Sequence, residues 1–298
     1  MDIKTRYGSF HTICSFFGAI GELMKGSGLA EIVIQSGICA SGSIEQVFRG
    51  KHYNRALRVH KLMSEALERL LLIKFIDICE SHLLQQVHDE TAALSKPSKE
   101  SLQSVLENEA CQIMFEQYSV FISKVRDGLL GKTAQLWLYY KDKISIVLRF
   151  LRATRENYMD LHIACLQQMR PLCFAMDHNN YAKYLTIYFV SLLNANHTHP
   201  GVEQLLRDDG FSVSRSNVSN SRIAVDQTIE QTINRHAKSH GGIVGFRRNL
   251  QAYYRWCVTR HLRGTYLTEA MENAGMISEE ELTHKDVRSS EIIKTENI

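Results

Sequence analysis

The chain of 298 residues is short of proline, of long apolar runs and of cysteine motifs. Only three prolines occur, and proline is the residue that most strongly interrupts helices, so long helices are permitted along most of the chain. No segment reaches the length of about 18 apolar residues that crosses a bilayer, and the N-terminus does not resemble a signal peptide. We therefore expect no membrane partner and a nuclear or cytoplasmic location.

Several classes of functional site also lack their sequence signals. The seven cysteines are odd in number and never form a C-x-x-C pair, which favours reduced thiols over a disulfide framework or a zinc site. The G-G-I-V-G run at 241–245 is not followed by Lys-Ser/Thr, and neither G-x-S-x-G nor H-E-x-x-H is present. These absences predict no cofactor and give no support to hydrolase or zinc-protease chemistry.

Apolar periodicity predicts a mainly α protein with several long helices. In the first long segment, apolar residues recur at i, i+3 and i+4 from Val59 to Leu71, which is the spacing of one helix face. Pro171 should kink or break the helix that contains it. The predicted helices cover 54–89, 101–130, 134–154, 160–176, 181–193, 223–239 and 249–266.

The first fifty residues differ from this pattern because glycines interrupt short apolar segments. The β-branched run from Glu31 to Gln35 predicts a short strand. A small α/β element, packed beside a larger multi-helix domain, is the fold that we expect.

Composition divides the chain into five predicted parts. Residues 1–50 form the glycine-rich α/β part, and 51–195 form a helical domain. Residues 196–221 are rich in serine, asparagine and glycine, which predicts a linker loop. Residues 222–264 form a basic helical segment, and 265–298 form an acidic tail.

Charge is segregated between the last two parts. Residues 222–264 hold eight Lys or Arg and two acidic residues, whereas 265–298 hold three Lys or Arg and eight acidic residues. One interpretation is a solvated basic helix beside an acidic tail; the other is a phosphate-contacting surface that the acidic tail shields. The candidate nucleic-acid-binding residues are Arg235, Lys238, Arg247, Arg248, Arg255, Arg260 and Arg263.

Two carboxylates mark a candidate catalytic position in the basic segment. Asp226 and Glu230 are four residues apart, so a helix places them on one face. Such a pair can hold Mg²⁺ when at least one further carboxylate joins it. The alternative is a solvated helix face without a metal.

Collinear segments over nearly the whole chain carry a family resemblance. They are G-S-F-H at 8–11 with G-A-I-G-E-L-M-K-G-S-G-L at 18–29, R-A-T-R-E-N-Y-M-D-L-H at 152–162, H-N-N-Y-A-K-Y at 178–184, F-S-V-S-R-S at 211–216, and D-Q-T-I-E-Q-T-I-N-R-H-A-K-S-H-G-G at 226–242. Together they resemble uncharacterised transposon-associated proteins of invertebrate animals. These proteins in turn resemble the C-terminal part of RNase H-like (DDE-type) transposases.

The resemblance implies a catalytic site built from three acidic residues and two metal ions. In that family a G-D-[FW]-H motif supplies the second acid, and a Glu of the I-E-Q helix supplies the third. Carried over, Glu230 takes the third position and His11 matches the motif histidine, but Ser9 stands where the second acid would be. The strand that carries the first acid would precede Met1, so the resemblance implies an incomplete site and a truncated RNase H-like part.

We therefore expect a transposable-element-derived protein without catalytic activity that binds nucleic acid weakly. One alternative is a metal-dependent nuclease or transposase fragment that uses Glu230 with Asp226 or Asp177, with Mg²⁺ required only in that case. Another is a helical interaction protein that self-associates through the helices of 54–130.

Overall fold

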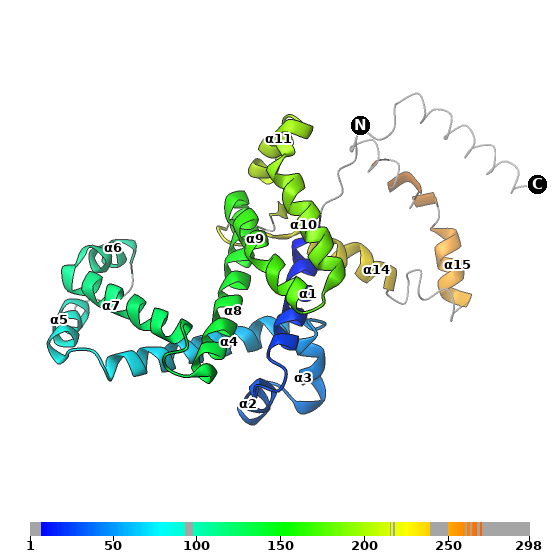
Figure 1. The fold of residues 1–298 in the computed structure, drawn as a ribbon. Helices are drawn as coiled ribbons and strands as arrows, with labels where there is room; N and C mark the ends of the chain where they lie inside the picture. The colour runs from blue at the N-terminus through cyan, green and yellow to red at the C-terminus, as the bar shows by residue number, and fades with distance from the viewer. Residues whose placement is uncertain are drawn as a thin grey trace, which may run out of the picture. The chain divides into compact units, whose positions relative to one another are not determined.

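In the computed structural model the chain is mainly α-helical (Figure 1). The structure describes residues 7–92, 98–214, 216, 218–238, 250–259, 261–262, 264–266 and 269. The longer helices are α1 (Ser9–Leu23), α2 (Leu29–Gln35), α3 (Ser41–Phe48), α4 (Tyr53–Ile76), α5 (Ser81–Ala92), α6 (Lys99–Glu107), α7 (Glu109–Arg126), α8 (Lys132–Glu156), α9 (Met159–Ala175), α10 (Asn179–Leu193) and α15 (Leu250–Val258).

Short elements complete the described part of the chain. Strands β1 (Ser212–Val213) and β2 (Ile223–Ala224) pair antiparallel, with Ser212 opposite Ala224. The other short elements are α11 (Ala195–Thr198), α12 (Val202–Leu205), the π-helical turn η1 (Leu206–Gly210), α13 (Val225–Ile229), the π-helical turn η2 (Glu230–Asn234) and α14 (Arg235–Lys238). No helix in the described ranges has the length and apolarity that a membrane span requires.

The chain divides into two compact units between Thr228 and Ile229. Residues 196–221, predicted to be a linker loop, lie inside the first unit and contain α11, α12, η1 and β1. Phe211 in this stretch is 1% exposed and belongs to the main core of the first unit. The large aromatic side chain therefore anchors a segment whose polar composition is typical of a loop.

Helices α1, α8, α9 and α10 supply most of the main core of the first unit, and α2, α3, α4 and η1 add further buried residues. Helix α1 contributes Ile13, Phe16, Phe17 and Ile20, whose spacing of three or four residues places them on one face. Helix α9 packs against both α8 and α10. Gly50, at φ +71°, lies where a Cβ would come within 1.9 Å of the Cys14 carbonyl oxygen, so glycine allows the chain to pass close to α1.

The predicted strand at Glu31–Gln35 is wrong, because these residues belong to helix α2. Leu29 and Val33, one turn apart, are buried in the main core, so tertiary packing overrides the β preference of the valine and isoleucines. In the described residues 7–50 the chain forms only helices and turns, and the expected α/β part is not seen there.

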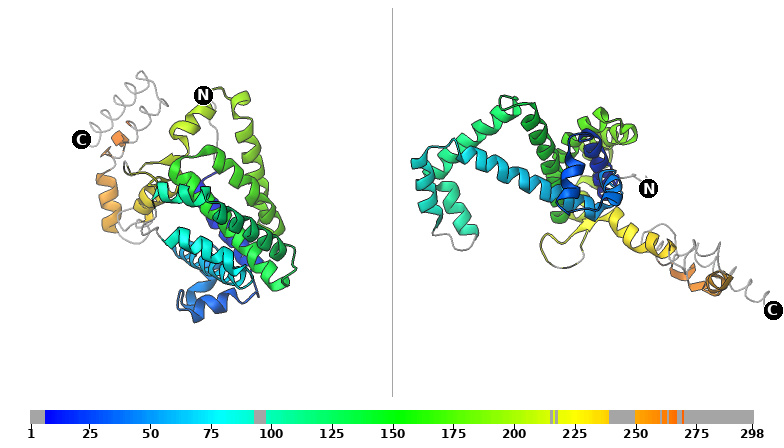
Figure 2. Two further views of the ribbon diagram at one scale, coloured as in Figure 1. Left: turned by 90° about the vertical axis from the view of Figure 1, so that its left-hand side faces the viewer. Right: turned by 90° about the horizontal axis from the view of Figure 1, so that it is seen from below.

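The predicted helix over 54–89 is two helices, since α4 ends at Ile76 and α5 begins at Ser81. The predicted helix over 101–130 is likewise divided, with Asn108 capping α7 by accepting a hydrogen bond from Cys111 N at 3.0 Å. Figures 1 and 2 show α5, α6 and α7 gathered at the end of α4 that lies away from α1. We call residues 81–126 the α5–α7 arm.

The arm is held by two small hydrophobic clusters, one of which it shares with α4 and α8. One joins Phe75, Phe121, Val125 and Leu138, and the other joins Leu83, Val87 and Cys111. Several large apolar side chains of the arm are exposed, among them Leu102 at 58% and Val120 at 57%. The arm is therefore less thoroughly packed than α8, α9 and α10.

Pro171 does not break its helix, because α9 continues through it to Ala175. Proline in a helix removes one backbone hydrogen bond, and here the helix ends only one turn later. Leu172 and Cys173, directly after the proline, are buried in the main core. Their burial holds the last turn of α9 in place.

Candidate functional site

The candidate carboxylate Asp226 caps the N-terminus of α1. Its Oδ1 accepts a hydrogen bond from Phe10 N at 3.1 Å, and its Oδ2 accepts one from His11 N at 2.9 Å. The His11 ring Nδ1 lies 2.9 Å from the same Oδ2. A negative charge at a helix N-terminus is stabilised by unpaired N–H groups and by the helix dipole. Both oxygens of Asp226 are thus engaged by α1.

The G-S-F-H segment is built around this carboxylate. Gly8 is the N-cap residue of α1, and a Cβ at Gly8 would lie 2.1 Å from Asp226 Oδ2. Glycine is therefore required for the carboxylate to reach the helix end. Ser9 is 2% exposed, and its hydroxyl has no hydrogen-bond partner among the described residues. The sequence-predicted residues Ser9, His11 and Asp226 come together, but as a helix cap.

Two ionisable groups lie in the electrostatic field of Asp226. Burial, with a smaller contribution from the Asp226 charge, raises the pKa of the Cys14 thiol to about 12. Burial also raises the pKa of Tyr53 to about 12, while Arg155 opposes this rise. At neutral pH the thiol and the phenol are both protonated, so neither supplies an anionic nucleophile or base beside the cap.

Glu230 lies in the second unit and is engaged by its own helical turns. Its Oε1 accepts a hydrogen bond from Asn234 Nδ2 at 2.8 Å, and its Oε2 lies 3.6 Å from Lys238 Nζ. Within the described residues, no group of three or more His, Cys, Asp or Glu side chains has the arrangement of a metal site. The carboxylates that the sequence suggested for Mg²⁺ thus have other partners in this structure.

Of the predicted nucleic-acid-binding residues, Arg235 and Lys238 are exposed on α14. Arg255 belongs to α15. Arg247, Arg248, Arg260 and Arg263 lie outside the described residues. Arg222, at the start of the basic segment, donates to the Ser212 hydroxyl and carbonyl oxygens at 2.8 and 3.0 Å, so it closes the β1–β2 pair.

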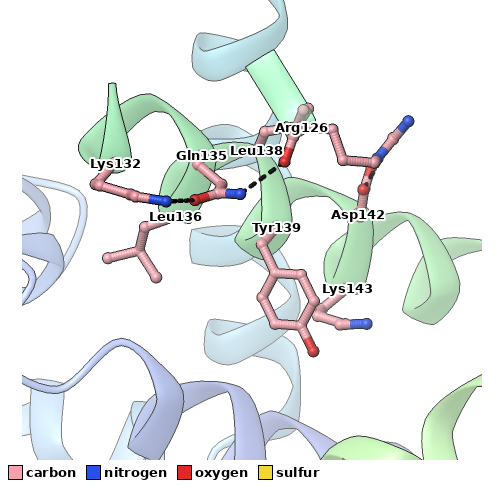
Figure 3. Close-up of a pocket in the computed structure, with 8 residues that line it drawn as sticks. All are labelled: Arg126, Lys132, Gln135, Leu136, Leu138, Tyr139, Asp142 and Lys143. Carbon is pink, nitrogen blue, oxygen red and sulfur yellow. Dashed lines mark hydrogen bonds and ion pairs between the residues drawn. The ribbon is translucent and has the colours of Figure 1, made fainter. Parts of the chain in front are cut away.

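A basic pocket where α7 meets α8 was not anticipated from the sequence (Figure 3). It has a volume of about 520 Å³, within the range of small-ligand sites. Its lining side chains are Arg126, Lys132, Gln135, Leu136, Leu138, Tyr139, Asp142 and Lys143. The spacing of Lys132, Tyr139 and Lys143, at i, i+7 and i+11, was the available signal, because it places them along one helix face.

A second, larger cavity of about 850 Å³ is almost entirely apolar. Side chains of α2, α4, α7, α8 and the adjoining turns line it, and they include the exposed Ile32, Leu70 and Leu130. Lys74, at its edge, lies 3.6 Å from Asp77 Oδ2. This apolar groove is lined in part by α4 and α7, which belong to the region 54–130 that the sequence suggested for self-association.

The comparisons with known proteins identify a family without assigning an activity. No curated protein and no solved structure matches the chain significantly. A family model described as "Domain of unknown function (DUF8702)" matches residues 1–297. Because this match covers nearly the whole sequence, both units included, the chain belongs to the DUF8702 family.

Proposed function

We propose that the chain is a transposable-element-derived protein that binds nucleic acid weakly and does not carry out DNA strand transfer. The absence of strand transfer is inferred from the contacts that the Asp226 carboxylate already makes with α1. Its two carboxylate oxygens accept hydrogen bonds from two backbone N–H groups of α1, and Oδ2 also contacts the His11 ring. A metal ion at Asp226 would have to displace these contacts and uncap α1.

The binding part of the proposal rests on charge. The segment 222–264 holds eight Lys or Arg and two acidic residues, and Arg235 and Lys238 are exposed on α14. Phosphate contacts of this kind give affinity that falls as salt rises. Base-specific contacts are not required, so weak binding without a sequence preference is the expected behaviour.

Fluorescence anisotropy with a labelled DNA duplex tests the binding part. We expect an affinity that falls linearly with the logarithm of salt concentration, and a shallower slope for the variant Arg235→Gln/Lys238→Gln. The matched control is Lys51→Gln/Lys61→Gln, which removes the same charge from exposed positions of the first unit. No binding at low salt, or equal slopes for the two variants, would contradict the proposal.

A nicking assay with Mg²⁺ tests the catalytic part. Because Glu230 contacts Asn234 and Lys238, we expect no cleavage of supercoiled DNA by the chain or by Glu230→Gln. Cleavage that requires Mg²⁺ and disappears in Glu230→Gln would establish the alternative, a metal-dependent nuclease.

A second candidate function is self-association through the helices of 54–130. The apolar groove beside α4 favours it, as do exposed side chains such as Leu70 at 62% and Ile73 at 57%. Contiguous exposed apolar surface marks interaction sites. Light scattering at increasing concentration should then report a dimer that Leu70→Glu/Ile73→Glu abolishes, whereas a monomer at all concentrations removes this candidate.

A further inference from the structure

The basic pocket is held in shape by the connection between α7 and α8. Gln135 Nε2 donates to the Arg126 carbonyl oxygen at 2.7 Å, which ties the end of α7 to the first turns of α8. Gly128, at φ +78°, lies where a Cβ would come within 3.1 Å of Gln135 Oε1. The pocket wall is therefore defined by a short turn and by two long helices, not by a loose surface loop.

Positive charge predominates in this pocket. Arg126, Lys132 and Lys143 face a single acidic residue, Asp142. Arg126 Nη2 lies 3.1 Å from Asp142 Oδ2, but the two side chains are 56% and 38% exposed, so this ion pair is weak and can exchange for a ligand anion. Neither lysine has a carboxylate partner in the part of the chain that the structure describes.

The spacing of the cations along α8 favours an extended anion over a compact one. Lys132 and Lys143 are eleven residues apart on α8, which corresponds to about 16 Å along the helix axis. The space between these two long flexible side chains admits a chain of phosphates that contacts both ammonium groups at once. Between them, Tyr139 is 42% exposed and has Lys143 Nζ 4.1 Å from its ring centroid.

We propose that this pocket binds a small organic phosphate that carries at least two phosphate groups. Arg and Lys are the side chains that bind phosphate oxygens through charge-assisted hydrogen bonds. Figure 3 shows Lys132 and Leu136 on one side of Tyr139 and Lys143 on the other, so the ring is a contact for the organic part of the ligand. This site lies within the first unit, and the inference does not rest on the proposed function.

Isothermal titration calorimetry of the full chain at low salt, in EDTA, tests this inference with three probes. Pyrophosphate consists of two phosphates with no organic part, ATP carries phosphates together with an aromatic base, and adenosine has the base but no phosphate. We expect pyrophosphate and ATP to bind and adenosine not to bind. Tighter binding of ATP than of pyrophosphate, lost in Tyr139→Ala, assigns the ring a contact with the base and supports the proposal. Equal binding of ATP and pyrophosphate would contradict the organic part of the ligand.

Matched variants separate this pocket from general electrostatic attraction. Lys132→Gln/Lys143→Gln should weaken the binding of pyrophosphate and ATP about tenfold, since it removes two charge-assisted contacts. Lys51→Gln/Lys61→Gln removes the same charge elsewhere in the first unit and should change the affinity less than twofold. This small change is expected because salt screens the attraction between the ligand and distant charges. Circular dichroism and Tm should be the same for both variants, because their lysines make no buried contacts that stabilise the fold.

Two results with these ligands and the two lysine variants would overturn the proposal. One is the absence of binding by both pyrophosphate and ATP, and the other is an equal loss of affinity in the two lysine variants. A third variant, Arg235→Gln/Lys238→Gln, lies in the second unit and should bind these ligands normally while its DNA binding is weakened. Loss of phosphate binding in this variant would also overturn the proposal, and the DNA measurement tests the proposed function separately.

Discussion

At the scale of single residues, the most informative contact joins positions 216 residues apart in the sequence. Asp226 binds the first turn of α1, and Gly8 leaves the space that its carboxylate needs. The sequence could identify Asp226 and His11 as candidates because each belongs to a motif. It could not predict that they contact each other, because no periodicity relates residues so distant along the chain.

Replacing Asp226 should destabilise the first unit. We expect Asp226→Ala to lower the free energy of unfolding by about 1–2 kcal/mol, since α1 loses its cap and the contact with His11. Urea denaturation followed by circular dichroism measures this change. Glu22→Ala, which removes an exposed partner of Lys25, is the control and should have an effect of less than about 0.5 kcal/mol.

Gly8→Ala should act through the same contact. The new Cβ would overlap the Asp226 carboxylate, so the helix cap must move. We expect a destabilisation that is much smaller when Asp226 is already alanine, which a double-mutant cycle measures. Gly42→Ala is the matched control, because its Cβ meets no atom within 4 Å; additive effects of Gly8→Ala and Asp226→Ala would refute the contact.

A buried histidine should make the stability depend on pH. His60 is 0% exposed and its Nδ1 lies 2.8 Å from the Tyr140 hydroxyl, and burial lowers its pKa to about 3. Between pH 6.5 and this lowered pKa, the unfolded chain binds a proton at His60 that the folded chain does not bind. The contribution of neutral His60 to the free energy of unfolding is therefore fully present above about pH 6.5. Below that pH the free energy of unfolding falls by up to about 1.4 kcal/mol per pH unit.

The pH dependence can be assigned by substitution. His60→Phe removes the titrating group, so the free energy of unfolding should fall less steeply between pH 6.5 and pH 4. Tyr140→Phe removes the hydrogen-bond partner but keeps the histidine, and its slope should match that of the unchanged chain. Identical slopes for all three proteins would exclude His60 as the source.

At the scale of elements, helices with clear apolar periodicity were well predicted, and short elements were not. The prediction of a mainly α protein is confirmed, and α8, α9 and α10 match the predicted helices within a few residues. Helix α2 was mistaken for a strand because Val33 and its neighbouring isoleucines favour strands locally. The breaks after Ile76 and Glu107 were missed, since neither contains the glycine or proline that marks a helix end in a sequence.

Packing also predicts unequal stability among the helices. The α5–α7 arm relies on small clusters, whereas α8, α9 and α10 share the main core. We expect amides of α5 and α6 to exchange with deuterium faster than those of α9, because local opening exposes few buried contacts. Leu83→Ala should accelerate exchange mainly in the arm, and Leu166→Ala should accelerate it across the core helices; equal protection of α5 and α9 would contradict this view.

At the scale of the whole molecule, the division between Thr228 and Ile229 differs from the boundary that composition indicated. Composition places the boundary between the two parts at residue 222, where the basic segment begins. Contacts place it later, because Ala224 is buried and Asp226 binds α1. Charge patterning indicates partners and solubility, whereas unit boundaries depend on long-range contacts that a single sequence does not reveal.

This boundary leads to a prediction for fragments of the chain. A fragment of residues 1–228 contains the three hydrophobic clusters and Asp226, so it should fold and unfold cooperatively. A fragment of residues 1–224 ends before Asp226 and should be less stable by about 1–2 kcal/mol, the contribution of the missing cap. Urea denaturation of both fragments measures the difference.

The decisive control is the longer fragment with Asp226→Ala. If the cap explains the difference, this variant should have the stability of the 1–224 fragment, although it retains Val225, Gln227 and Thr228. Should it match the unchanged 1–228 fragment instead, chain length rather than the carboxylate would account for the loss. Agreement between the variant and the shorter fragment would establish that Asp226 closes the first unit onto α1, and that the segment 226–242 begins with a structural residue.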